Sequence, residues 1–173
     1  MRVDVGKDRG MATVAFIHAH PDDEALLTAG TMRALKELGH RVIVIMATNG
    51  EAGLSGTQNF SDLGGIRKRE LQESARILGV SETYFLNYKD SGLDGKTNFH
   101  QSNFSSASVE EIARQIADIL RNEKVQLVVG YDQKGGYGHP DHLQVHKATL
   151  AASKIAQTPV VAYATVDRQT IAK

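Results

Sequence analysis

The sequence of 173 residues contains no cysteine. Disulfide bonds, thiolate catalysis and cysteine-ligated zinc sites are therefore excluded, and the composition suits a reducing compartment. Twenty basic side chains balance twenty acidic ones, so the chain has no overall positive field for nucleic acid. No segment approaches the ~20 apolar residues of a membrane span, and the polar N-terminus lacks the apolar centre of a signal peptide. We expect a cytoplasmic protein that binds neither nucleic acid nor membrane.

Hydrophobic residues make up 41% of the chain, enough for a substantial core in one domain. We expect a loose N-terminal tail over residues 1–11 and a single domain over 12–173. Apolar runs typical of strands alternate with helical patterns along the whole length. The predicted strands cover 12–17, 41–48, 84–86, 125–131 and 159–164, and the predicted helices cover 24–38, 66–78, a segment after Ser108, and 143–156. This alternation predicts an α/β fold, a doubly wound and mostly parallel sheet of about five strands.

Local signals set several of these helix boundaries. In the first helical segment four apolar residues share one face: Leu26, Ala29, Met32 and Leu35. Gly39 follows that helix as its C-cap, and Gly79 ends the second helix. Ser108 and Glu111 form a capping-box pattern at the start of the third.

Polar residues follow the first strand at the point where it ends. His20, Asp22 and Asp23 flank Pro21, which cannot donate to a sheet ladder, and a helix begins next. The carboxyl edge of an α/β sheet is where such folds bind ligands. The imidazole of His20 and the carboxylate of Asp23 therefore suggest a metal site, with the Asp22 carboxylate directed elsewhere. An aspartate in this position is equally typical of a helix N-cap.

A second polar cluster, His139-Pro140-Asp141-His142, follows a glycine-rich turn after the fourth predicted strand. Both clusters leave carboxyl ends of parallel strands, so we expect them at one edge of the sheet. Two histidines and one carboxylate, with a fourth position open to water, are typical of catalytic zinc. We assign His20, Asp23 and His142 as ligands of Zn²⁺, and Fe²⁺ or Mn²⁺ also suits these nitrogen and oxygen donors.

These residues predict the parts of an amide hydrolase. Zinc acidifies its water and polarises a carbonyl, and a neighbouring carboxylate that is not a ligand, Asp22, can accept the proton of the attacking water. We expect His139 to donate to the departing amine or to the oxyanion, with Asp141 holding its ring and raising its pKa. Tyr137, next to a flexible glycine pair, can offer its hydroxyl to the same site.

Two further histidines have plainer interpretations. His18 points to the other side of its strand and is interpreted as a buried structural residue. His146 follows His142 by one helical turn, a spacing that zinc pairs use, but no glutamate follows the first histidine. We therefore favour a supporting or surface role for His146.

The two clusters resemble the motifs of the PIG-L/LmbE-type zinc deacetylases, which remove acetyl groups from N-acetylglucosaminyl substrates. His20-Pro21-Asp22-Asp23-Glu24 matches the first motif of that family, and His139-Pro140-Asp141-His142 matches the last. The segment from Asp132 to Gly138 is close to the deacetylase and conjugate amidase of actinobacterial mycothiol metabolism. The resemblance implies a Rossmann-like three-layer sandwich and the same zinc ligands, with Asp22 as base, His139 as acid or electrostatic stabiliser, and Tyr137 assisting.

The resemblance also extends to three substrate contacts. Arg67 matches a family arginine that points toward the sugar site, and Asp90 matches an aspartate that contacts sugar hydroxyls; Glu51 has the same standing. From the residues alone, Arg67 could equally pair with Glu70 or other acids on its helix, and Asp90 could be only a turn former.

The function we expect is a zinc-dependent hydrolase that releases acetate from a small N-acetyl amino sugar conjugate. One alternative is an amidase that acts on a larger sugar–thiol conjugate, and another is a homologue that binds metal or sugar without turnover. Family members usually continue for several elements beyond the strand near 160–166. We therefore expect the domain over 12–173 to lack elements that often shape the substrate pocket, and we leave a homo-oligomer open.

Overall fold

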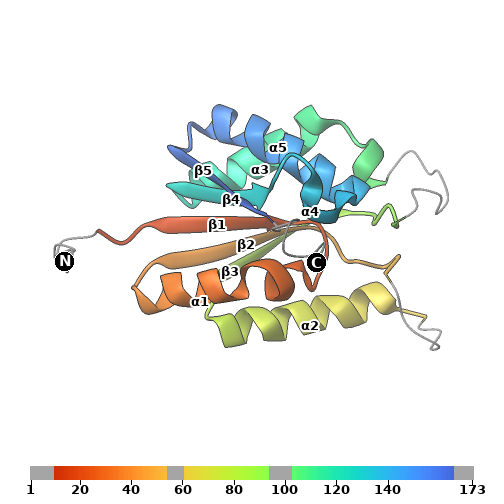
Figure 1. Ribbon diagram of the computed structural model, residues 1–173, viewed down its shortest axis with the longest axis horizontal. Coiled ribbons are helices and arrows are strands. Elements are labelled where there is room, and N and C mark those ends of the chain that lie inside the picture. Colours follow the sequence, from red (N-terminus) through yellow and green to blue (C-terminus); the bar gives the residue numbers. More distant parts are fainter. Residues whose placement is uncertain (1–9, 54–60, 94–102, 166–173) are drawn as a thin grey trace, which may run out of the picture.

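The computed structural model describes residues 10–53, 61–93 and 103–165. Most of the expected N-terminal tail, residues 1–9, lies outside these ranges. Strands and helices alternate along the described chain (Figure 1). The strands are β1 (Thr13–His18), β2 (Arg41–Thr48), β3 (Glu82–Tyr88), β4 (Leu127–Tyr131) and β5 (Val160–Ala164). The helices are η1 (Glu24–Thr28), α1 (Ala29–Glu37), α2 (Leu63–Leu78), η2 (Phe104–Ser106), α3 (Val109–Asn122), α4 (Gly135–Gly138) and α5 (Pro140–Ala156).

The five strands form one sheet in the order β3-β2-β1-β4-β5, and every pairing is parallel. The prediction of a doubly wound, parallel α/β sheet is therefore confirmed. β1 lies in the centre, between β2 and β4, because consecutive strands are added first on one side of it and then on the other. This reversal beside β1 is the switch point where open α/β sheets bind their ligands.

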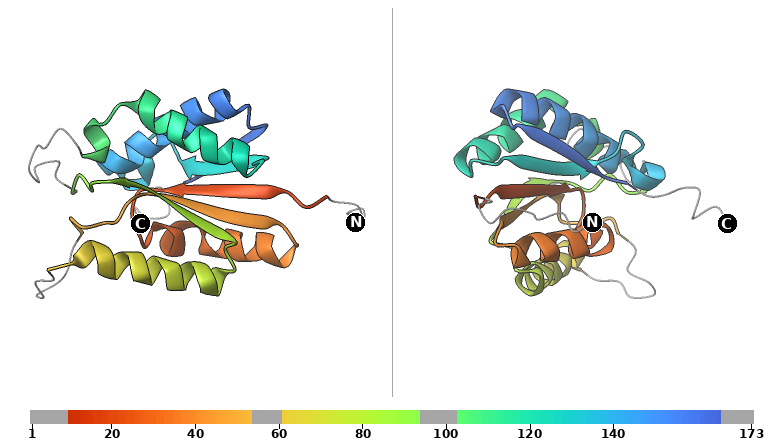
Figure 2. Two further views of the ribbon diagram at one scale, coloured as in Figure 1. Left: turned by 180° about the vertical axis from the view of Figure 1, so that it is seen from behind. Right: turned by 60° about the vertical axis from the view of Figure 1, so that its left-hand side comes forward.

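Helices cover both faces of the sheet and make three layers (Figures 1 and 2). α1 and α2 lie on one face, and α3 and α5 lie together on the other. Successive residues of β1 alternate between the two cores, as a strand requires. Phe16 packs with Met32 in the core beneath α1 and α2, whereas Ile17 belongs to the core that α3 and α5 cover.

Most predicted boundaries agree with the structure to within a few residues. The β2 prediction matches residue for residue, and Ser108 caps α3 by accepting from the backbone N–H of Glu111. α2 begins three residues before its predicted start, because the Asp62 side chain caps it by accepting from the N–H of Gly65. α5 also begins earlier than predicted, at Pro140, because the rigid φ of proline suits the first turn of a helix.

The prediction that Leu26 faces the core is wrong. Residues Glu24–Thr28 form η1, a π-helical turn, before the α-helix begins at Ala29. A π turn holds more residues than an α turn, so it shifts the facing of the first side chains. Leu26 is 77% exposed, and the next residue, Leu27, packs against the core instead.

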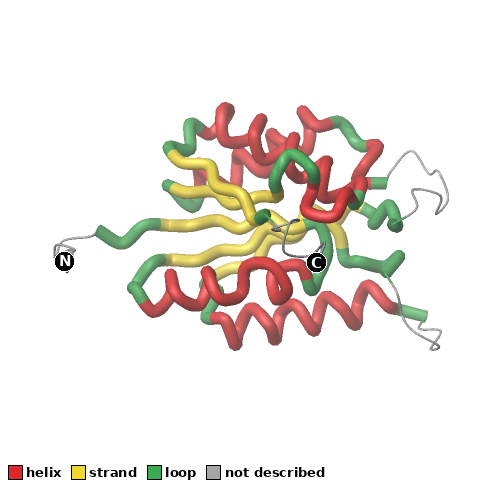
Figure 3. Tube along the Cα trace, viewed as in Figure 1, coloured by secondary structure: helices red, strands yellow, loops and turns green. Residues whose placement is uncertain are grey.

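The loops that follow β1, β2, β3 and β4 leave from the carboxyl edge of the sheet (Figure 3). Both polar clusters of the sequence lie at this edge. Helices that meet the length and apolarity of a bilayer span do not occur in the described ranges.

Candidate metal centre

Asp23 is a buried residue whose carboxylate turns toward two histidines. It precedes η1, but its side chain makes no capping hydrogen bond to that helix, so the N-cap interpretation does not hold. Its Oδ2 atom lies 3.4 Å from His20 Nδ1 and 3.3 Å from His142 Nε2. Residues that are some 120 positions apart in the chain therefore meet around one carboxylate oxygen.

Hydrogen bonds fix which ring nitrogens can act as ligands. His142 Nδ1 lies 3.2 Å from the carbonyl oxygen of Gly135, which only accepts, so Nδ1 carries the proton. His20 Nε2 is held in the same way by the carboxylates of Asp141, at 3.1 Å, and Asp90, at 3.3 Å. The other nitrogen of each ring faces Asp23. His142 Nε2 is fully buried and makes no hydrogen bond.

This arrangement fits a metal ion. Two nitrogen lone pairs and a carboxylate oxygen repel one another at such short range unless a metal ion or a proton lies among them. Tetrahedral zinc with bonds of about 2.0–2.2 Å spaces its ligand atoms by about 3.3–3.6 Å, which matches the two distances from Asp23. A second carboxylate or carbonyl on the far nitrogen is the usual support of a metal-ligating histidine.

Other groupings of potential ligands lie in the same place. Among the described residues, two sets of three have ligand atoms within 4.8 Å of one another: His20, His139 and His142, and His20, Asp90 and Asp141. Both share His20 with the expected set, and the first also shares His142. The structure thus contains a candidate metal site, and the ligand set of His20, Asp23 and His142 stays a prediction.

The pKa values in this cluster follow from burial and from these pairings. Burial would lower the pKa of His20, but hydrogen bonds with Asp141, Asp23 and Asp90 outweigh it and raise the pKa to about 11. Burial would likewise raise the pKa of Asp23, yet the imidazoles of His142 and His20 beside it hold that pKa well below its usual range. Cationic charge is therefore favoured among these side chains.

Asp22 has a different environment from its neighbour. Its backbone has φ of +104°, a strained value for a residue other than glycine, which directs the side chain away from that of Asp23. Its Oδ2 accepts a hydrogen bond of 2.8 Å from Arg67, and the side chain is 57% exposed. Burial raises its pKa, and the charge of Arg67 opposes this. The two adjacent aspartates are thus separated, one inside the cluster and one at its entrance.

Glu24 and Arg67 hold Asp22 in this position. Glu24 is buried, and its carboxylate accepts from the N–H of Asp22 at 3.0 Å and from the hydroxyl of Ser74 at 2.7 Å. Arg67 also donates to the carbonyl oxygens of Pro21 and Gly50. The alternative pairing of Arg67 with Glu70 is not what the structure shows. The positioning role of Glu24 was not predicted, because the sequence does not reveal the turn that it stabilises.

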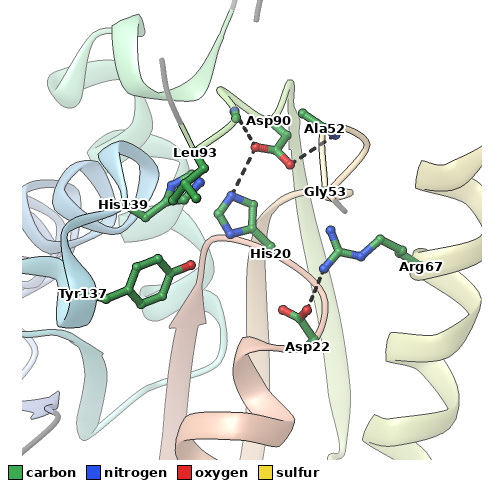
Figure 4. A pocket seen from close by; sticks show the side chains of 10 residues that line it. His20, Asp22, Ala52, Gly53, Arg67, Asp90, Leu93, Tyr137 and His139 are labelled. Carbon is green, nitrogen blue, oxygen red and sulfur yellow. Dashed lines mark hydrogen bonds and ion pairs between the residues drawn. The ribbon is translucent and has the colours of Figure 1, made fainter. Parts of the chain in front are cut away.

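A pocket of about 270 Å³ opens beside this cluster (Figure 4). Asp22 and Arg67 lie on one side of it, and His139 and Tyr137 lie on the other. The pocket is lined by His20, Asp22, Ala52, Gly53, Arg67, Asp90, Gly92, Leu93, Tyr137 and His139. Six of the ten expected site residues therefore line one pocket.

The donor groups of the pocket come from the second cluster and from the glycine-rich turn before it. Nδ1 of His139 accepts the backbone N–H of Asp141 at 3.1 Å, so the neutral ring carries its proton on Nε2. Tyr137 is 66% exposed, and its ring lies edge-on to those of His139 and His142. Burial raises the pKa of the Tyr137 hydroxyl to about 12, so it remains a donor at neutral pH.

The expected pairing of the Asp141 side chain with His139 is corrected by the structure. The Asp141 carboxylate instead contacts His20 and accepts the N–H of Ser91 at 3.0 Å; only its backbone N–H meets His139. The expected rise in the pKa of His139 is also wrong. Burial and the charge of His20 lower that pKa, although Asp141 opposes the change. The first turn of α5 simply directs the carboxylate away from the residue two positions before it.

Asp90 and Glu51 lie together beside the pocket. Asp90 is buried, and its carboxylate accepts from the N–H groups of Gly92 at 2.9 Å and Ala52 at 3.2 Å, besides contacting His20. Glu51 accepts the backbone N–H of Asp90 at 3.2 Å and is not among the residues that line the pocket. Asp90 is thus more than a turn former, and Glu51 secures the loop that carries it.

Two further histidines, His18 and His146, make hydrogen-bond contacts outside the pocket lining. His18 is buried, its Nε2 lies 2.8 Å from the Thr28 hydroxyl, and burial lowers its pKa to about 4. His146 Nδ1 lies 2.9 Å from the carbonyl oxygen of Tyr131.

Tyr131 is a site residue that sequence reasoning missed. Its hydroxyl donates to Asp23 Oδ2 at 2.7 Å, and its ring stacks on His142 with centroids 4.0 Å apart. Burial raises its pKa well above 10, so the hydroxyl remains protonated. Its position as the last residue of β4, at the carboxyl edge, was the available signal.

The fold and the site define an α/β protein with a candidate metal centre and pocket at the carboxyl edge of its sheet. Residues 15–153 match the family described as PIG-L, GlcNAc-PI de-N-acetylase. The chain belongs to this family, so the resemblance seen in the two motifs is confirmed.

Curated relatives carry the name 1D-myo-inositol 2-acetamido-2-deoxy-alpha-D-glucopyranoside deacetylase. The protein from Thermomonospora curvata is 40% identical over 159 residues, covering 84% of this chain and 54% of the relative. The protein from Acidothermus cellulolyticus is 38% identical over 153 residues, covering 81% and 52%. The chain therefore spans about half the length of the curated relatives it matches.

Solved structures show the same fold. The N,N'-diacetylchitobiose deacetylase from Pyrococcus horikoshii superimposes with a TM-score of 0.69 at 30% identity, over 85% of this chain and 51% of that chain. The conserved protein TT1542 from Thermus thermophilus also gives 0.69, at 23% identity, over 92% and 68%.

Proposed function

We propose that this chain forms the active site of a zinc-dependent deacetylase that removes the acetyl group from a small N-acetylglucosamine-type conjugate. The names of the related proteins support the reaction, because the curated relatives and the Pyrococcus enzyme are deacetylases of acetylated amino sugars. The observation that carries the proposal is the separation of two neighbouring carboxylates. Asp23 lies between two imidazoles, whereas Asp22 lines the pocket and pairs with Arg67.

His20, Asp23 and His142 would hold the zinc ion. Their support is the short spacing around Asp23 Oδ2, the hydrogen bonds that turn one nitrogen of each ring toward Asp23, and the buried Nε2 of His142, which makes no hydrogen bond. A zinc ion bound there would supply a Lewis acid and an acidified water molecule.

Asp22 would act as the general base. It is a carboxylate outside the expected ligand set, it lines the pocket, and burial raises its pKa. Arg67 keeps the carboxylate at a fixed place in the pocket. Asp22 can then accept the proton of a water molecule that attacks the acetyl carbonyl.

His139 and Tyr137 would supply hydrogen-bond donors from the opposite side of the pocket. His139 presents a protonated Nε2, because its Nδ1 is occupied by the backbone N–H of Asp141. Its Nε2–H can donate a hydrogen bond to the oxyanion, and the proton that Asp22 took from water can pass to the amine nitrogen as the C–N bond breaks. The exposed hydroxyl of Tyr137 can donate to the oxyanion of the tetrahedral intermediate.

Arg67 and Asp90 would contact the sugar, since both line the pocket. Glu51 would act indirectly, by holding the backbone of Asp90. Asp141 would act on His20 rather than on the substrate, as the partner of the ring nitrogen that does not face Asp23.

The test compares metal content and release of free amine in three variants. We expect Asp22→Ala to retain zinc and to lose ~10²-fold or more in turnover of N-acetylglucosamine conjugates, the usual effect of removing a general base. Asp23→Ala should lose both zinc and activity. Asp90→Ala should retain zinc, because Asp90 is not one of the proposed ligands. Loss of zinc in this variant would favour the alternative grouping of His20, Asp90 and Asp141.

Other outcomes identify the competing functions. Release of amine only from bulky amides would indicate the amidase. Zinc binding without hydrolysis of any amide would indicate a binding homologue, and the proposal would then be wrong. If Asp22→Ala loses zinc and Asp23→Ala keeps it, the roles of the two aspartates are reversed.

A further inference from the structure

Tyr131 touches both segments that carry the expected metal ligands. Its hydroxyl accepts the backbone N–H of Ala19, directly before His20, at 3.0 Å, and donates to Asp23 Oδ2 at 2.7 Å. Its ring lies flat against that of His142, with an interplanar angle of 7°. The side chain is 1% exposed, so water does not compete for these contacts.

The hydroxyl has one proton, and its two partners leave a single way to use it. The Ala19 N–H can only donate, and the Asp23 carboxylate can only accept. The hydroxyl oxygen therefore accepts a hydrogen bond from the N–H of Ala19, and its O–H donates a hydrogen bond to Asp23. The orientation of the Asp23 carboxylate is thereby tied to the backbone next to His20. The ring of Tyr131 fixes the plane of the His142 imidazole.

We propose that Tyr131 is a positioning residue of the metal centre, which sets the Asp23 carboxylate and the His142 ring at ligand distance before a metal binds. This inference rests on the proposed function, because it assumes that these two residues are ligands. Partners of this kind usually contribute 10- to 100-fold to metal affinity or activity. Tyr131 itself would touch neither the metal ion nor the substrate.

The chain offers a matched control at the opposite end of the sheet. Tyr84 also donates its hydroxyl to a carboxylate, that of Glu123, at 2.6 Å. Tyr84→Phe therefore removes the same kind of hydrogen bond far from the pocket. Tyr131→Phe keeps the volume and the stacked ring, and removes only the link between Ala19 and Asp23.

The experiment measures zinc affinity of the full chain by competition with a chelator, for the wild type, Tyr131→Phe and Tyr84→Phe. We expect Tyr131→Phe to bind zinc ~10- to 100-fold more weakly and Tyr84→Phe to match the wild type. A second readout is the visible spectrum of the Co²⁺-loaded protein, which reports the coordination geometry. We expect it to change for Tyr131→Phe alone. Thermal unfolding of the metal-free variants shows whether both remain folded.

The outcomes separate this inference from the proposed function. If the wild type binds no zinc, the proposed function fails. If the wild type binds zinc and Tyr131→Phe matches Tyr84→Phe in affinity and in the Co²⁺ spectrum, the positioning role is overturned while the proposed function stands. If Tyr131→Phe fails to fold without metal, an unchanged Co²⁺ spectrum of the metal-loaded variant overturns the role, and an altered one supports it.

Discussion

The guanidinium of Arg67 donates to the carboxylate of Asp22 at 2.8 Å, from a helix on one face of the sheet to the turn that follows β1. The same guanidinium binds the carbonyl oxygens of Pro21 and Gly50. One side chain of α2 thus fixes the loops after β1 and β2 relative to each other. The general base of the proposed reaction depends on this connection for its place.

Replacement of Arg67 should therefore damage catalysis without removing the metal. A lysine at this position cannot serve three acceptors in the planar geometry of a guanidinium. We expect Arg67→Lys to lower kcat/KM by ~10²-fold, the effect of misplacing a catalytic group by about 1 Å, and to leave zinc content unchanged. Steady-state kinetics with metal analysis tests this. Arg76→Lys, in an exposed pair with Glu73 on the same helix, should behave as the wild type.

Two neighbouring glycines allow a test of how closely the turn approaches His142. Gly135 and Gly136 both have positive φ, +60° and +65°, so alanine is strained at either position. A Cβ on Gly135 would lie 2.9 Å from the Cβ of His142, whereas a Cβ on Gly136 would meet nothing within 4 Å. We expect Gly135→Ala to weaken zinc binding by ~10-fold or more, and Gly136→Ala to lower only the unfolding temperature. Equal zinc affinities in the two variants would contradict the assignment of His142 as a ligand.

The hydrogen bond between Tyr84 and Glu123 should make stability depend on pH away from the active site. The Tyr84 hydroxyl lowers the pKa of Glu123 below 4.5, so the contribution of Glu123 is present above that pH and is lost on acidification. The same bond raises the pKa of Tyr84 to about 12, so the contribution of Tyr84 is complete below about pH 10 and is lost as the pH rises through 12.

Glu123→Gln should therefore lower the free energy of unfolding by about 1 kcal/mol or less at pH 7, since the pair is partly solvated, with the difference from wild type shrinking below pH 4.5. Urea unfolding at pH 3.5 and 7 measures it. The exposed Glu110, paired with Arg114, supplies the control Glu110→Gln, which should show little effect at either pH. If the stability difference between Glu123→Gln and the wild type grows on acidification, this prediction is contradicted.

The π turn at Glu24–Thr28 leads to a pair of contrasting stability predictions. Met32 is completely buried against β1, and Met32→Ala should lower the free energy of unfolding by about 2–5 kcal/mol. Leu26 lies earlier in the same helical segment and is exposed, so Leu26→Ala should change the free energy of unfolding by less than about 0.5 kcal/mol. Chemical denaturation of both variants measures these changes. A large loss of stability for Leu26→Ala would show that Leu26 faces the core, as a regular α-helix predicts, and would contradict the π turn.

Sequence reasoning predicted the parts of the fold that depend on hydrophobic runs and on clear boundary residues. β2 lies between Gly39 and Asn49-Gly50, so its apolar run has sharp ends, and its bounds were predicted correctly. The meeting of His20 with His142 was also predictable, because both follow parallel strands that end at one edge. The bounds of β2 follow from the local sequence pattern, and the meeting of the two histidines follows from the order of parallel strands, which that pattern also predicts.

Side-chain directions at the site were not predictable in the same way. Spacing could not show that Asp141 turns to His20, since this depends on the orientation of the first turn of α5. The role of Tyr131 was hidden, because an aromatic residue that ends a buried strand normally belongs to the core. The π turn depends on tertiary packing and on the strained backbone at Asp22. These features arise from contacts between segments far apart in the chain.

The most direct test of the central claim is to locate the metal in crystals of the zinc-loaded protein by anomalous diffraction at the zinc edge. The account predicts one ion at about 2.0–2.2 Å from His20 Nδ1, an Asp23 oxygen and His142 Nε2, with the Asp22 carboxylate outside the coordination sphere. An ion held instead by His20 Nε2, Asp90 and Asp141, or no ion at this edge of the sheet, would contradict it.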